Sequence, residues 1–314
     1  MKKLISQTLV AFGLLITPTF AASFGPLVSP EQLNAAVGDA APFIIDIRAT
    51  DKEGASLFEK GHIAGSVNAP YGLFRGPKEN PGQLVTEDHL EKVLGDIGAD
   101  KNRATVVAYQ GADISDFGAA ARVYWTLKMA GFTDISILNG GIDTWTQQGL
   151  PLETGAVVLK PTSVDISFSD RWLANRDEIL KIVGGEEKAR LVDARPEEFW
   201  KGEKKHPAAA RPGTLPQSEY FVHSSWFDNK PVIADAAKAK EIAAKAGFKN
   251  GEELVSFCNT GHWAATNWFA LSELAGLDNV KLYPESMVGY SNAGHELANT
   301  PGLFKTLIKQ VTGG

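Results

Sequence analysis

An internal repeat of about 145 residues constrains this chain more than any other feature. The apolar run at 43–48 is echoed at 190–195, and each copy ends in Asp-x-Arg. A second run at 105–109 is echoed at 253–257. Short apolar runs bounded by polar turns are typical of buried strands. Because 314 residues suffice for two domains of ordinary size, the echoes predict two copies of one domain.

The elements after the second strand define the fold class. A helix is expected there in each copy, ending at Gly131 and at Gly276, because glycine suits the left-handed residue that closes a helix. Further apolar runs follow at 135–138 and 280–283. Strand, helix and strand in this order give parallel pairing through right-handed crossovers. We therefore expect an α/β fold of two domains, each a mostly parallel sheet covered by helices on both faces.

The N-terminus is typical of a secretory signal. Lys2 and Lys3 supply positive charge, an apolar stretch follows at 9–16, and Ala21 is a small residue of the kind found at cleavage sites. The alternative is an uncleaved membrane anchor, for which the stretch is short. We expect residues 1–22 to be a signal peptide, so that the mature protein is periplasmic and has no membrane association after cleavage.

The remaining boundaries follow from the repeat and from proline. The N-terminal domain is expected at 23–150 and the C-terminal domain at 170–314. The segment between them, 151–169, carries Pro151 and Pro161 and is expected to be a linker. The formal net charge is -6 and no basic stripe is visible, so we expect no nucleic-acid partner.

Cys258 is the single cysteine, which excludes an internal disulfide. A free thiol is a liability in an oxidising compartment unless it serves a function, although a buried inert cysteine is the alternative. Cys258 directly follows the apolar run at 253–257 and precedes a helix expected near Ala264. Ligands of open α/β sheets bind at the carboxyl ends of strands, and backbone amides entering a helix favour negative charge. Cys258 is therefore the candidate nucleophile.

Three motifs carry a resemblance to a known family. They are Asp46-x-Arg48, the Gly-His-Ile-Ala-Gly-Ser run at 61–66, and the run at 138–145 that contains Asn-Gly-Gly. This set resembles the rhodanese family, and the segment 283–287 is similar to the one that follows the active-site helix in two-domain thiosulfate sulfurtransferases. The resemblance covers essentially the whole mature chain. It implies two rhodanese domains, the first inactive and the second catalytic.

The resemblance also implies the reaction. Sulfane sulfur would pass from a donor such as thiosulfate to Cys258 and then, from the persulfide, to cyanide or a thiol. The donor is expected to be a small molecule or a protein persulfide, and no metal or organic cofactor is needed. The position taken to match Cys258 in the first copy is Gln110, which cannot carry sulfur. The first copy is therefore expected to be catalytically silent.

The loop after Cys258 departs from the family pattern. Asn259 stands where a base is frequent, Trp263 stands where Arg or Thr is usual, and His262 is the one side chain of the loop that could become cationic. The candidate substrate-binding residues are Asn259, Thr260, Gly261, His262, Trp263 and Arg195. For Arg195 the alternative is a structural ion pair with the preceding aspartate, because Arg48 repeats the pattern in the silent copy.

The sequence around Cys258 also bears on two other functions, a phosphatase and a non-catalytic module. A phosphatase of this fold needs an arginine six residues after the cysteine, where this chain has Ala264, so that reading is rejected. A non-catalytic rhodanese-like module that binds or senses sulfur remains the alternative to a sulfurtransferase. The scarcity of basic residues around Cys258 favours the module, and the retained cysteine at the loop apex favours the enzyme.

Overall fold

The computed structural model describes residues 23–38 and 41–301. The predicted signal peptide at 1–22 lies outside the described residues, and so does the end of the chain from 302. No helix in the described part of the chain is long and apolar enough to cross a membrane.

The first repeat contains one sheet of five strands, all paired in parallel, in the spatial order β1-β5-β4-β2-β3. Its strands are β1 (Leu27–Val28), β2 (Phe43–Asp46), β3 (Ser66–Asn68), β4 (Thr105–Ala108) and β5 (Ile135–Leu138). Its helices are α1 (Pro30–Ala36), α2 (Leu57–Lys60), the 3-10 turn η1 (Tyr71–Phe74), α3 (Glu87–Asp96), α4 (Phe117–Met129) and α5 (Gly141–Gln147).

The second repeat contains a sheet in the order β7-β6-β8-β9, again with every pair parallel. Its strands are β6 (Arg190–Asp193), β7 (Glu219–Tyr220), β8 (Leu254–Phe257) and β9 (Val280–Leu282). Its helices are α6 (Arg176–Gly184), α7 (Glu197–Trp200), the 3-10 turn η2 (His223–Trp226), α8 (Ala236–Lys245), α9 (Trp263–Phe269), the π-helical turn η3 (Ala270–Leu274) and α10 (Ser286–Asn292).

The two sheets have the same plan. The backbone of Leu173 pairs in parallel with Leu282, just as β1 pairs with β5 in the first repeat. Strands β2, β4 and β6, β8 are buried along their length, apart from the half-buried Arg190, because helices cover both faces of a parallel sheet. The predicted α/β fold of two repeated domains is confirmed.

Helix starts follow from local sequence. Ser29, Thr86, Asn175 and Asp235 precede α1, α3, α6 and α8, and each side chain accepts a hydrogen bond from the backbone N–H three residues on. Such caps satisfy amides that a helix leaves unpaired at its start, and each contributes about 1 kcal/mol.

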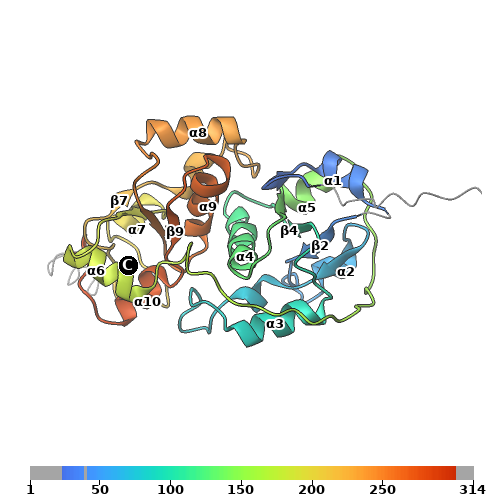
Figure 1. Cartoon of the computed structure of the whole chain (residues 1–314), viewed down its shortest axis with the longest axis horizontal. Coiled ribbons are helices and arrows are strands. Elements are labelled where there is room, and N and C mark those ends of the chain that lie inside the picture. The colour runs from blue at the N-terminus through green and yellow to red at the C-terminus, as the bar shows by residue number, and fades with distance from the viewer. Residues whose placement is uncertain (1–22, 39–40, 302–314) are drawn as a thin grey trace, which may run out of the picture.

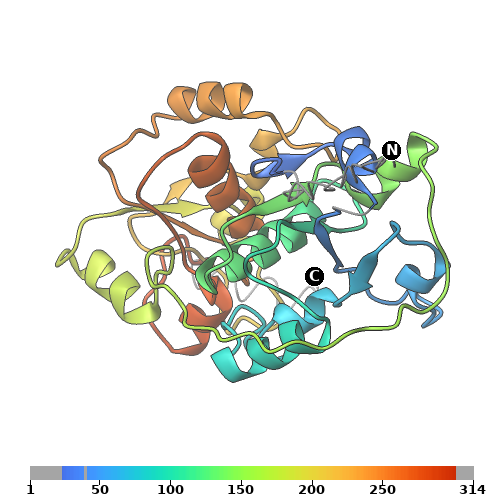
Figure 2. The ribbon, with the colours of Figure 1, turned by 45° about the vertical axis from the view of Figure 1, so that its right-hand side comes forward.

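The two repeats meet along α4 and α9, which lie side by side between the sheets (Figures 1 and 2). The ring of Phe269 contacts Phe117 at 5.4 Å and Tyr124 at 5.0 Å between centroids. One hydrophobic cluster runs from the first repeat into the second and includes Cys258. The seam between the repeats therefore passes directly beside the candidate nucleophile.

The segment between the repeats runs along the outside of the first one (Figure 2). It forms no helix or strand between 154 and 169. Glu153 exchanges two backbone hydrogen bonds of 2.8 Å with His62, and the amide of Thr162 donates to the carbonyl of Gly95 at 2.9 Å. These contacts fix the path of the segment on the first repeat.

Candidate active site

Cys258 lies immediately beyond the carboxyl end of β8, in a central position of the second sheet. It is 1% exposed. The loop that follows enters α9, and in the described chain the backbone amides of residues 259–262 donate to no protein acceptor. Free amides in a loop that enters a helix can hold a negatively charged group. The position and the surroundings suit a thiolate or a persulfide.

The backbone of Cys258 is held by the segment before α10. Its N–H donates to Oγ of Ser286 at 3.0 Å, and its carbonyl accepts from the N–H of Met287 at 3.0 Å. Ser286 is fully buried and has a φ of +50°, a left-handed conformation that is strained for a residue other than glycine. Its Oγ also donates to the carbonyl of Tyr283 at 2.8 Å. These bonds compensate for the strain and fix the cysteine.

Arg195 positions the side chain of Asn259. The guanidinium makes a buried ion pair of 2.7 Å with Asp193 and donates to the carbonyl of Gly213 at 2.8 Å. Its remaining nitrogen, Nη1, donates to Oδ1 of Asn259 at 3.3 Å. In the first repeat, Arg48 pairs with Asp46 at 2.6 Å in the same manner. The structural pairing is thus present in both copies, and the contact with the loop is what distinguishes Arg195.

The rest of the loop is bound by the first repeat. Nη2 of Arg75 donates to the carbonyl of Thr260 at 2.8 Å. The two ring nitrogens of His262 face Oη of Tyr71 at 3.1 Å and the carbonyl of Ser115 at 2.8 Å. The active-site loop is therefore held from both sides of the domain seam.

His262 does not supply the positive charge that the loop lacks. Burial, together with the nearby Arg75 guanidinium, lowers the pKa of His262 to about 4. Its partners agree with a neutral ring, because Nε2 faces a carbonyl and must donate, whereas Nδ1 faces a hydroxyl that Arg75 already binds at 3.0 Å. The ring is a neutral link between the repeats at physiological pH.

Trp263 is the first residue of α9, directly after the loop, and it contacts the first repeat. Its Nε1 donates to Oγ of Ser115 at 2.7 Å, and its ring is stacked on His223 with the centroids 5.0 Å apart. Phe199 approaches the same ring edge-on at 5.9 Å. These contacts make an apolar wall beside the loop.

Gly261 is required by its surroundings as well as by its φ of +68°. A methyl group at this position would lie 2.6 Å from the carbonyl oxygen of Pro284 and would overlap with Nη1 of Arg122. The loop therefore packs directly against a guanidinium from the first repeat.

The residue that matches Cys258 in the first repeat is Tyr109, so the assignment of Gln110 is wrong by one position. Asp46 pairs with Ala108 as Asp193 pairs with Phe257, which places the next residues, Tyr109 and Cys258, in register. The N–H of Ile142 likewise donates to the carbonyl of Tyr109, as that of Met287 does to Cys258. The conclusion is unaffected, since neither tyrosine nor glutamine carries sulfur.

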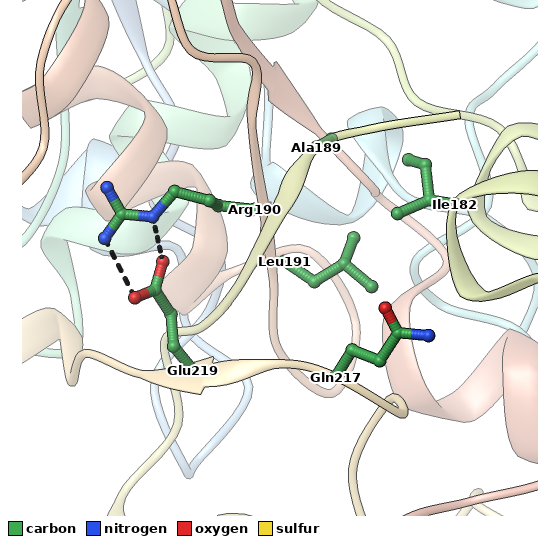
Figure 3. A pocket seen from close by; sticks show the side chains of 6 residues that line it. All are labelled: Ile182, Ala189, Arg190, Leu191, Gln217 and Glu219. Atoms are coloured by element: carbon green, nitrogen blue, oxygen red, sulfur yellow. Dashed lines mark hydrogen bonds and ion pairs between the residues drawn. The ribbon is translucent and has the colours of Figure 1, made fainter. Parts of the chain in front are cut away.

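Across residues 23–38 and 41–301, no group of three or more His, Cys, Asp or Glu side chains could hold a metal ion. Arg190 begins β6, so the pocket beside it opens at the opposite end of the sheet from Cys258. In that pocket Arg190 is paired with Glu219 at 2.7 Å (Figure 3). The residues that line it are Ile182, Ala189, Arg190, Leu191, Gln217 and Glu219.

The site predicted from the sequence includes no residue of the first repeat, and the structure adds several. Tyr71, Arg75, Ser115 and Arg122 all contact or approach the loop after Cys258. Arg122 could have been recognised from the sequence, because it is a charged residue among mostly apolar residues in the middle of α4. The other three lie in turns, where a polar residue is unremarkable.

Comparison with known proteins gives the family. The model of the Rhodanese-like domain matches residues 29–148 and 175–293. A Mycobacterium bovis protein provisionally named a thiosulfate sulfurtransferase is 28% identical over 249 residues, which cover 76% of this chain and 86% of that protein. The sulfur carrier protein TtuD of Thermus thermophilus is 26% identical over 246 residues, covering 75% and 84%.

Two solved structures share the fold. The 3-mercaptopyruvate sulfotransferase SseA of Escherichia coli superposes with a TM-score of 0.72 at 22% identity, covering 84% of this chain and 99% of that one. The anaerobic ergothioneine biosynthesis enzyme of Chlorobium limicola superposes with a TM-score of 0.75 at 20% identity, covering 90% and 72%. With two matched copies across most of its length, the chain belongs to the rhodanese-like family as a tandem-domain member.

Proposed function

We propose that the protein is a sulfurtransferase that carries sulfane sulfur on Cys258. The observation that carries the proposal is the position of the single cysteine, just beyond the carboxyl end of β8. Its backbone is hydrogen-bonded to Ser286 and Met287, and the four amides that follow it are free. The names of the Mycobacterium and Thermus relatives, a sulfurtransferase and a sulfur carrier, support the same chemistry.

The proposed reaction has two steps. The Cys258 thiolate attacks the outer sulfur of thiosulfate, a sulfur–sulfur bond forms, and sulfite leaves with the electron pair of the broken bond. An acceptor such as cyanide then attacks the terminal sulfur of the persulfide, giving thiocyanate and restoring the thiolate. One anionic group remains on Cys258 throughout, so a site that stabilises negative charge serves both steps.

The second candidate, a sulfur-binding or sensing module without turnover, is favoured by one observation. Cys258 is 1% exposed and the loop around it is tied to the first repeat by Arg75 and His262. A donor and an acceptor must both reach the sulfur in an enzyme, whereas a module needs to load only once. Turnover requires that the donor and the acceptor reach the sulfur past these contacts.

A donor screen on the purified mature protein separates the two. Thiosulfate, 3-mercaptopyruvate and a low-molecular-weight persulfide are each offered with cyanide, and thiocyanate is measured. An enzyme gives catalytic turnover with ping-pong kinetics, seen as parallel double-reciprocal lines when donor and acceptor are varied. Cys258→Ser is the matched control. A protein that gains one sulfur on Cys258 but forms no thiocyanate with any donor would establish the module instead.

We also propose that the protein is exported to the periplasm. The support is the sequence of residues 1–22, with Lys2, Lys3 and the apolar stretch at 9–16. N-terminal sequencing of the periplasmic fraction tests it, with a mature start near residue 22 as the expected result. An intact Met1 in that fraction would contradict the proposal.

A further inference from the structure

Arg122 is a charged residue in α4, one of the two helices that form the seam. It lies in the middle of α4, is 0% exposed, and has buried residues on both sides in sequence. Helix α4 packs against α9 of the second repeat, so the residues of α4 that face outward from the first repeat face the second one. An arginine is costly at such a position unless it is paired.

Within the described residues, the pairing of Arg122 is incomplete. Nη2 donates to the carbonyl of Gly82 at 3.0 Å, whereas Nε and Nη1 have no hydrogen-bond partner there. No carboxylate forms an ion pair with it among those residues, and its guanidinium lies over the ring of Trp125, 5.0 Å from the ring centroid. Arg195 and Arg48, which are buried to a similar degree, are each paired with an aspartate.

The free side of the guanidinium points at the loop after Cys258. Nη1 is the atom that a methyl group on Gly261 would overlap, so it borders the loop directly. Arg122 and Cys258 interact electrostatically, and Arg75 approaches the same loop through the carbonyl of Thr260. Burial and the neighbouring Arg75 charge lower the pKa of Arg122 to about 9, so the guanidinium keeps its charge at neutral pH.

Arg122 is a buried cation with two free donor nitrogens, and it lies beside a loop whose amides are also free. No anionic side chain among the described residues pairs with it. His262 is neutral, so no side chain of the loop itself supplies positive charge. A small sulfur anion on Cys258 has the charge, the size and the acceptor lone pairs that this arrangement lacks. The first repeat would then complete the chemistry of the second.

We propose that Arg122, a residue of the catalytically silent repeat, is the cation that stabilises the anion on Cys258, whether thiolate or persulfide. The inference rests on the proposed function, in which Cys258 is the sulfur carrier. It also explains how a loop with Asn259 and Trp263 in place of basic residues can serve anionic sulfur. The second repeat would be incomplete as an isolated domain.

The test measures how readily the thiolate of Cys258 forms. Because the chain has one cysteine, iodoacetamide labels a single site, and the rate of alkylation against pH reports the thiolate fraction. Arg122→Met should move the midpoint of the profile upward by about one pH unit, which is about a tenfold lower rate at pH values below both midpoints. Arg122→Lys, which keeps the charge, should restore most of the shift. A change of access alone would alter the plateau rate and leave the midpoint in place.

Arg103→Met is the matched control. Arg103 is an exposed arginine of the same repeat that donates to the carbonyl of Ala41, so its loss removes the same charge far from the loop. Its profile should coincide with that of the wild type. Coincident profiles for Arg122→Met and the wild type would overturn the inference.

Thermal unfolding separates this role from a structural one. If the charge of Arg122 serves an anion, Arg122→Met should fold with an equal or higher Tm, because an unpaired buried charge has been replaced by an apolar chain. If neither Arg122→Met nor Arg122→Gln folds, the guanidinium belongs to the fold and the inference is wrong. Failure of the wild type to form a persulfide with any donor, with the shift still present, would reject the proposed function and retain the charge role of Arg122.

Discussion

The hydroxyl of Tyr71 lies 3.1 Å from Nδ1 of His262 and joins the first repeat to the active-site loop of the second. The same hydroxyl accepts from Arg75 at 3.0 Å, and the far nitrogen of His262 faces the carbonyl of Ser115 at 2.8 Å. A directed chain of hydrogen bonds therefore runs from the first repeat through the loop and back. The loop cannot move without breaking it.

Removal of the Tyr71 hydroxyl should loosen this link. Tyr71→Phe leaves the ring in place and deletes two hydrogen bonds, so we expect a loss of about 1 kcal/mol or more in the free energy of unfolding. Tyr220→Phe is the matched control, because Tyr220 is exposed and no hydrogen bond of its hydroxyl is found among the described residues. Urea denaturation of both variants measures the difference. Equal stabilities would show that the Tyr71 hydroxyl contributes nothing to the link.

The lowered pKa of His262 predicts a pH dependence of stability. Between about pH 6.5, the ordinary value, and about pH 4, the unfolded chain binds a proton that the folded ring does not. Stability should therefore fall as the pH falls through this window, by at most about 1.4 kcal/mol per pH unit for this group. Burial also lowers the pKa of His223, which adds to the effect.

His262→Gln isolates the contribution of His262, because glutamine keeps a donor and an acceptor but does not titrate in this range. Its unfolding free energy should depend less on pH between 4 and 6.5 than that of the wild type. Parallel pH profiles would mean that His262 is charged in the folded protein. Because the lowered pKa keeps the His262 ring neutral, we do not expect mild acid to strengthen thiosulfate binding through this ring.

The two buried Asp–Arg pairs predict a contrast between the repeats. Arg195→Met and Arg48→Met each leave a buried aspartate uncompensated, and each should cost about 3–5 kcal/mol. Only Arg195 also holds Asn259, at 3.3 Å, so at a temperature where both variants remain folded only Arg195→Met should lose sulfur transfer. Thiocyanate formation measures it. Equal activity losses would show that Arg195 has no role beyond the fold.

Gly261 can be tested against a glycine in open space. Gly276 has a similar φ of +76° but nothing within 4 Å of a methyl group placed on it. Gly276→Ala should therefore cost only the backbone strain, about 1–2 kcal/mol, and retain activity. Gly261→Ala adds the overlap with Arg122 and Pro284 and should lose both stability and sulfur transfer. Activity and urea midpoints of the two variants are compared, and similar behaviour would contradict the close packing.

The fold could be predicted from the sequence because the repeat and the buried parallel strands produce strong local patterns. Strands β2, β4, β6 and β8 fall where the apolar runs predict them. The match of Gln110 to Cys258 failed by one residue, because an apolar run without alternation, such as 105–109, does not fix the pairing register. The hydrogen bonds of Tyr109 and Cys258 with α5 and α10 settle it.

Only the site residues of the second repeat could be predicted from the sequence. Cys258 and its loop are contiguous, so sequence places them together. Arg122 lies far before Cys258 in the sequence, and its approach to the loop depends on how α4 packs against α9. The neutrality of His262 likewise depends on burial by residues of the other repeat. A local sequence pattern therefore predicts neither the approach of Arg122 nor the neutrality of His262.

The most direct test of the central claim is the mass of the protein after exposure to a sulfane-sulfur donor. Wild-type protein should gain one sulfur atom, located on Cys258 by peptide mapping, and should lose it when cyanide is added. Tyr109→Phe, at the matching position of the silent repeat, should behave as the wild type, and Cys258→Ser should gain nothing. A wild-type mass that no donor changes, or a gain that persists in Cys258→Ser, would contradict the account.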